Sequence, residues 1–259
     1  MFDRLQRPFL TVETGEAYQP VRLTYETHQA DEFVQALENL QCIQKNSVSN
    51  SWSWYWKSEC EDQHFDSVDS FRKNPDLPIR LGTLTLRDDK ISFSLPSFKR
   101  ACLAVPFFNR MITGQNIFKI VSAYFINKVF ALDERLPHGF TELFKDDELD
   151  RIMNQRIEDY HKVKTRCEQA DTPEAAFQIL SEYTQSEAKK RLPYAERYLF
   201  DLTGKEDMDV VFLAFYIYLR GRELVAIKRW FGQSGYTLAD AADETIEQVF
   251  GGMGLDIIE

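Results

Sequence analysis

The pattern of the chain changes near its middle, and this change limits the folds that are open to it. Before residue 130, short β-prone segments alternate with turn residues, whereas most of the later sequence has helical periodicity. The first 130 residues carry 15 Lys and Arg against 15 Asp and Glu, and the rest carries 16 against 26. The net charge of −10 therefore belongs to the second half. We predict an α+β fold, with a small antiparallel sheet and helices in the N-terminal half and a mostly α-helical C-terminal half.

Residues 81–95 give the clearest local signal, which is that of a β-hairpin. Two runs of alternating residues flank the polar turn Arg87–Lys90. A chain of 259 residues is long enough for one or two domains of roughly 150 residues each. We predict an α+β subdomain at 1–113 that contains the hairpin, and an acidic helical subdomain at 114–259 that packs on the first.

Several segments of the second half have the spacing of helices. Apolar residues recur at three- and four-residue steps in 114–132 and in 142–168. The strongest helix start lies at 172–174, where a threonine can cap the helix, a proline fits the first position and a glutamate follows. We predict a helix from there to about Arg191, which ends before Pro193. The apolar segment 208–231 fits either a buried strand or a helix, and its length favours a helix.

Composition excludes some classes of function. Hydrophobic residues make up 44% of the chain and aromatic residues 14%, which indicates a folded protein with a substantial core. An isoelectric point near 5.0 makes binding to nucleic acids or anionic membranes unfavourable, because both depend on many Lys and Arg contacts. The longest apolar run, Val210–Leu219, is too short to cross a bilayer as a helix. Met1–Glu16 lacks the apolar core of a signal peptide, so we expect a soluble, cytoplasmic protein.

Three tryptophans form the first candidate binding surface. Trp52, Trp54 and Trp56 alternate with other residues, so in a strand all three indoles lie on one face. Such a strip could stack bases or sugars, or anchor a protein partner. The alternative, which we favour, is that the strip packs beneath a helix as part of the core.

A basic and aromatic cluster forms the second candidate surface. Lys99 and Arg100 precede Phe107 and Phe108 in a predicted helix, within an otherwise neutral half of the chain. So few charges make a weak phosphate-binding footprint, and a solvated helix face is the simpler interpretation.

Two sets of residues could contribute to a metal site. Cys60, Asp62 and His64 lie close together in sequence, but structural zinc sites use two pairs of Cys or His and no second pair follows. Glu158 and His161 share a helix face with the spacing of di-iron proteins, but the required second motif is missing. We therefore predict no metal and no cofactor, and interpret these residues as solvated.

Two groups of cations lie on helices of the second half. Lys189, Lys190 and Arg191 come at a predicted helix end, where positive charge is favourable. Arg220 and Arg222 lie on the apolar helix, and a buried arginine beside carboxylates there could hold two elements together or receive an anionic ligand.

The sequence contains no complete set of catalytic residues, so we favour a protein that is not an enzyme. The leading hypothesis is a protein-interaction or regulatory adaptor protein, whose partner is another protein or a second copy of the chain. One alternative is a metal-assisted hydrolase that uses Cys60, Asp62 and His64, or Glu158 and His161. Another is a weak single-stranded nucleic-acid binder that uses the tryptophan strip.

Overall fold

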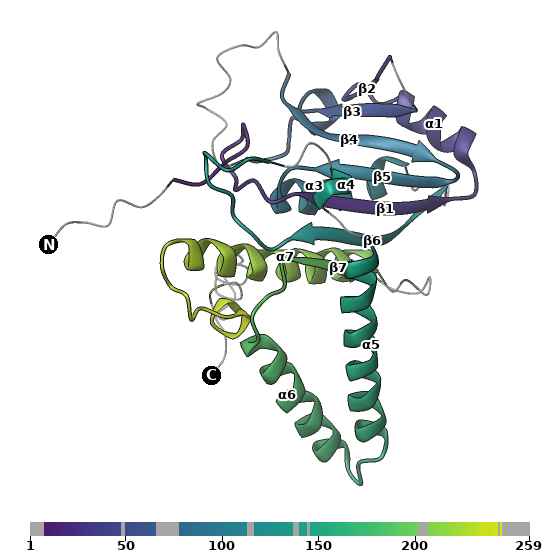
Figure 1. Ribbon diagram of the computed structural model, residues 1–259. Coiled ribbons are helices and arrows are strands. Elements are labelled where there is room, and N and C mark those ends of the chain that lie inside the picture. Colours follow the sequence, from purple (N-terminus) through teal and green to yellow (C-terminus); the bar gives the residue numbers. More distant parts are fainter. Residues whose placement is uncertain are drawn as a thin grey trace, which may run out of the picture.

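The computed structural model describes residues 8–47, 50–65, 78–112, 117–136, 140–143, 146–200, 202, 207–242 and 244. Over these residues the chain forms a seven-stranded antiparallel sheet with the strand order β2-β3-β4-β5-β1-β6-β7 (Figure 1). The strands are β1 (Val21–Thr27), β2 (Ile43–Lys45), β3 (Ser51–Tyr55), β4 (Arg80–Arg87), β5 (Lys90–Leu95), β6 (Phe118–Ile126) and β7 (Ala195–Leu199). The helices are α1 (Ala30–Glu38), a short 3₁₀ helix (Ser58–Cys60), α3 (Phe98–Ile112), α4 (Phe140–Leu143), α5 (Asp146–Glu168), α6 (Pro173–Lys189) and α7 (Met208–Trp230). The predicted α+β class is confirmed.

The predicted hairpin is present as β4 and β5. Their register pairs Arg87 with Lys90, and the two turn residues, Asp88 and Asp89, have φ angles of 46° and 59°. Positive φ at both central residues is the geometry of the two-residue turn that matches the twist of the flanking strands.

The layout of the second half is only partly as predicted. The segment 114–132 was expected to be helical, but it contains β6, which lies in the sheet between β1 and the edge strand β7. Phe118 and Ile120 are buried, and the exposed Lys119 lies between them, which is strand alternation. The helical spacing failed because the same apolar residues also fit a period of two. The subdomain boundary at residue 113 stays a prediction, although β6 and β7 complete the sheet.

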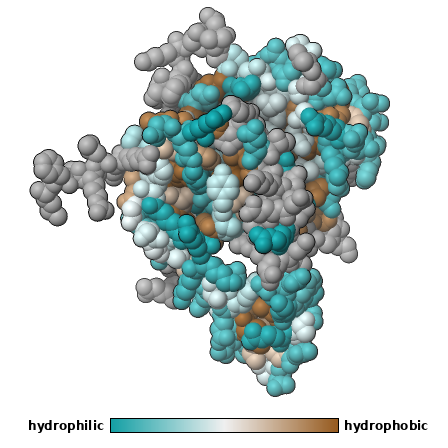
Figure 2. Space-filling view, viewed as in Figure 1, coloured by the Kyte–Doolittle hydropathy of each residue, from teal (hydrophilic) through white to brown (hydrophobic). Residues whose placement is uncertain are grey.

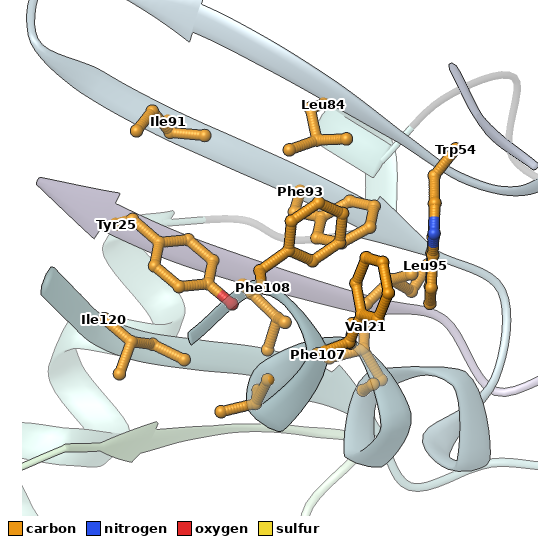
Figure 3. Close-up of a cluster of buried hydrophobic side chains, with 14 of the residues drawn as sticks. Val21, Tyr25, Trp54, Leu84, Ile91, Phe93, Leu95, Phe107, Phe108 and Ile120 are labelled. Atoms are coloured by element: carbon orange, nitrogen blue, oxygen red, sulfur yellow. The ribbon is translucent and has the colours of Figure 1, made fainter. Parts of the chain in front are cut away.

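The main core lies between one face of the sheet and helices α1, α3 and α7. Alternate residues of β1 and β5 point into it, and Phe107 and Phe108 reach it from α3 (Figure 3). Trp54 lies among these side chains, with its ring stacked on Phe107 at a centroid distance of 5.6 Å. The apolar segment 208–231 is helical, and α7 packs on α3 and contributes Phe215 to the same core.

Helices α5 and α6 form a hairpin that projects from the body of the molecule (Figure 1). The predicted helix start at Thr172 is confirmed, because its hydroxyl accepts a hydrogen bond from the Ala175 N–H (3.2 Å) and Pro173 begins α6. Helix α5 also contacts β7, so the hairpin is joined to the edge of the sheet. Among the described residues, none of the helices combines the length and the apolar content that crossing a bilayer requires.

Candidate functional site: a basic groove at the base of the helical hairpin

The tryptophans of the predicted strip have different environments. Trp54 is fully buried, and its Nε1–H donates to the sulfur of Cys60 (2.9 Å). Trp52 is also buried and donates to Glu38 of α1 (3.1 Å), whereas Trp56 lies just beyond β3 and is half-buried. Trp52 and Trp54 therefore fit the alternative interpretation, in which the strip is part of the core, since neither can contact a partner unless the core opens.

The residues of the predicted basic cluster are not gathered on one surface. Phe107 and Phe108 are in the main core, and Arg100 is fully buried. The Arg100 guanidinium is bound by Glu16 (3.3 Å) and Glu13 (3.1 Å), so its charge is neutralised inside the protein. The half-buried Lys99 lines a small cavity of about 320 Å³ between α3 and α7.

The candidate metal ligands are also separated. Cys60 is buried against Trp54, whereas Asp62 and His64 are exposed, as are Glu158 and His161 on α5. Nowhere in the described part of the chain do three His, Cys, Asp or Glu side chains converge in the way that a metal site needs.

A larger concave site lies where the hairpin joins the body. We call it the basic groove. Its volume is about 1110 Å³, and it is lined by residues that follow β6, by the α6–β7 connection, by the C-terminal half of α7 and by the loop after α7. The side chains that give it its character are Lys128, Lys189, Arg191, Tyr194, Arg229 and Trp230.

The charge of this groove is opposite to that of the whole chain. Lys128, Lys189, Arg191 and Arg229 line it, and none of the described residues that line it is Asp or Glu. Lys128 is bound to Glu134, which compensates its charge. Lys189 and Arg191 are exposed, and within the described residues neither pairs with a carboxylate. The site therefore concentrates positive charge at a concave surface, where an anion can be surrounded by several donors.

One wall of the groove is supported by a buried ion pair. Glu196 of β7 binds Arg222 of α7 through both of its oxygens, at 2.7 Å from Nε and 3.3 Å from Nη2. The same carboxylate accepts a hydrogen bond from Nδ2 of Asn127 (2.6 Å), a residue that lines the groove. The sequence indicated what Arg222 could do if it were buried beside a carboxylate, and the structure shows that it is. The pair fixes α7 against the sheet at the site.

Other contacts fix the remaining walls. The Asn127 N–H donates to the Tyr194 carbonyl (2.8 Å), which joins the end of β6 to the α6–β7 connection. Arg229 Nε donates to the Tyr236 carbonyl (2.8 Å), so this guanidinium is held by the loop after α7. Burial raises the pKa of Tyr194, and the negative charge of Glu134 raises it further. The Tyr194 hydroxyl therefore stays protonated at neutral pH and can donate to an anion.

Sequence reasoning singled out two of these four cations, Lys189 and Arg191, but not the convergence of all four. Lys189 and Arg191 were interpreted through the helix end on which they lie, and Lys128 and Arg229 come from other elements. They meet because β6 and β7 pair side by side, and β6 was predicted to be a helix. The sequence signal that could have indicated this groove is the run of three cations before Pro193, because such a run is unusual in the acidic half of the chain.

Comparison of the chain with protein-family models, with curated proteins and with solved structures finds no match to any of them.

Proposed function

We propose that this is a regulatory binding protein that recognises a small, multiply charged anion in the basic groove. The observation that supports this function is the convergence of Lys128, Lys189, Arg191 and Arg229 on one concavity without a lining carboxylate. Guanidinium and ammonium groups are the side chains that bind phosphate and carboxylate groups most strongly.

The charge of the remaining surface favours a small ligand over a polymer. A chain with a net charge of −10 repels a long polyanion, which has to cover surface well beyond the groove. A small anion contacts only the groove and is exposed to its local positive potential. The groove volume of about 1110 Å³ is slightly above the range for small-molecule sites, roughly 300–1,000 Å³, so the groove has room for a small ligand.

Titration calorimetry with tripolyphosphate tests the proposal. We expect the wild-type protein to bind, and K189E/R191E to bind at least about tenfold more weakly, because two attractive charges become repulsive. The matched control is K162E/K164E, which changes two exposed lysines of α5 outside the groove and alters the net charge equally. Equal weakening in both variants would show a non-specific charge effect and would contradict the proposal.

A second candidate function, docking of a protein partner, is supported by the surface of the helical hairpin. Helix α6 has no buried residue, and it exposes Leu180 and 73% of Phe177. Figure 2 shows a hydrophobic patch on the projecting hairpin, surrounded by hydrophilic residues. An exposed apolar patch that polar residues surround is the kind of surface on which a protein partner docks.

This second function is tested by F177S/L180S. We expect the variant to keep the wild-type melting temperature, because neither side chain is buried, and to lose self-association or co-purification of a partner. Q178S/Q185S on the same helix is the control. If F177S/L180S associates as strongly as the wild type, docking through this face of α6 is excluded.

A further inference from the structure

The basic groove contains aromatic surface as well as positive charge. Tyr194 and Trp230 line it together with Lys189, Arg191 and Arg229. Tyr194 is 51% exposed although its backbone is fixed by the hydrogen bond from Asn127. Trp230 packs edge-to-face on Phe9, with ring centroids 6.4 Å apart, so the indole is held in place at the groove. An inorganic anion has no planar or apolar group that could pack against these rings.

We infer that the ligand is a nucleoside diphosphate or triphosphate, an inference that rests on the proposed anion-binding function. The phosphates would contact Lys189, Arg191 and Arg229, and the base would lie against the ring of Trp230 or Tyr194. Guanidinium forks match phosphate oxygens geometrically, and aromatic rings bind every nucleobase through its face. The groove has the volume for such a molecule, whereas a single phosphate would fill only a small part of it.

A nucleoside phosphate could come from a free nucleotide or from the end of a nucleic-acid strand. The two sources share the chemistry of base and phosphate but differ in the charge that extends beyond the site. The second half of this chain carries 26 Asp and Glu against 16 Lys and Arg, which repels the continuing strand. The inference therefore specifies the free nucleotide.

Comparison of ADP with pyrophosphate in magnesium-free buffer tests the inference, because both ligands carry a diphosphate and only ADP carries a base. We expect ADP to bind at least about tenfold more tightly. Y194L removes the exposed ring, and W230F tests the indole with a small change of volume. Y160L is the control, since Tyr160 has a similar exposure, 52%, on α5 outside the groove. We expect W230F to weaken ADP binding and leave pyrophosphate binding unchanged. Y194L removes a hydroxyl donor as well as a ring, so we expect it to weaken ADP binding by a larger factor than pyrophosphate binding. We expect Y160L to change neither.

The other outcomes show whether the nucleotide inference fails alone or together with the anion-binding function on which it rests. Equal affinity for ADP and pyrophosphate would overturn the inference and leave the anion-binding function standing. Binding of neither ligand would overturn both. Tighter binding of a mixed-sequence single-stranded oligonucleotide than of ADP would overturn the assignment to a free nucleotide. Quenching of tryptophan fluorescence by ADP that is smaller in W230F than in the wild type would support placement of the base at Trp230.

Discussion

Two buried arginines, Arg100 and Arg222, hold distant parts of the chain together. Arg100 joins α3 to the segment before β1 through Glu16, and it also donates to the carbonyl of Arg80 (3.0 Å). Arg222 joins α7 to β7 through Glu196. A buried ion pair adds little stability over a well-packed apolar pair, but loss of one partner leaves an uncompensated charge in the interior. Each arginine therefore makes the fold sensitive to its carboxylate.

Replacement of Glu196 by alanine is predicted to destabilise the protein by about 3 kcal/mol or more, because Arg222 would remain buried without its counter-charge. Urea denaturation followed by circular dichroism measures the change. The control is E187A, which removes the carboxylate of an exposed pair with Lys190 and is expected to cost less than about 1 kcal/mol. A loss of stability in E196A no greater than in E187A would show that the pair is not essential for packing.

Glu59 gives a prediction of pH dependence. Its carboxylate accepts hydrogen bonds from the N–H groups of Gln41 and Cys42, both at 3.0 Å. Burial raises the pKa of this carboxyl, but these hydrogen bonds outweigh it, so the pKa lies below its ordinary value. A lowered folded-state pKa contributes stability above the unfolded-state pKa, and this stability is lost as the pH falls through the folded-state value.

We therefore expect E59Q to be less stable than the wild type by about 1 kcal/mol at pH 7, since one charged acceptor is lost. The difference should begin to shrink as the pH falls below about 4, near the ordinary pKa of a glutamate, and should reach its limit once the pH is below the lowered folded-state pKa. Urea denaturation of both proteins at several pH values measures it. A difference that is constant with pH would mean that the charge of Glu59 does not matter.

At the level of single residues, the sequence identified the environment of some groups but not of others. Thr172 was identified as a helix cap because its partner is three residues away. The burial of Arg100 beside Glu16 could not be predicted, since the two residues are 84 positions apart and only the fold brings them together. The pair of Arg222 and Glu196 could not be predicted either, and the sequence indicated only what would follow if Arg222 were buried beside a carboxylate.

At the level of elements, the pairing of β4 with β5 depends on a close approach at Gly82. A Cβ atom there would lie 2.6 Å from Leu95 Cδ2 and 2.9 Å from the carbonyl oxygen of Ser94. The second neighbour is backbone and cannot move as a side chain does. We predict that Gly82→Ala destabilises the protein by about 1–3 kcal/mol, as measured by thermal unfolding. An unchanged melting temperature would show that the strands can separate locally without cost.

Element prediction succeeded where one period dominates, and succeeded in only one of two segments where both a helix and a strand fit. The β4–β5 hairpin and α6 have strong local signals, in the turn residues and in the helix cap. Strand β6 has apolar residues that fit both a helix and a strand, and its pairing with β1 and β7 decides the outcome. Segment 208–231 also fits both structures, since its residues are β-prone, and there the helix favoured by its length is confirmed.

At the level of the whole molecule, the distribution of charge decides which ligands the basic groove can take. The net charge of −10 lies in the second half, and the same half supplies Lys189, Arg191 and Arg229 to the groove. Composition predicts poor binding of nucleic acids and anionic membranes, but this average does not show a local concentration of positive charge. The groove could not be predicted from sequence, since it requires the end of β6, the α6–β7 connection and α7 to meet.

The most direct test of this account is the location of a bound anion. A crystal soaked in sodium tungstate, with data collected at the tungsten edge, reveals the anion by its anomalous scattering. We predict a peak in the basic groove within contact distance of Lys189, Arg191 or Arg229, and no such peak in crystals of K189E/R191E. Tungstate bound elsewhere, with the groove open to solvent and unoccupied, would contradict the assignment of this groove as the functional site.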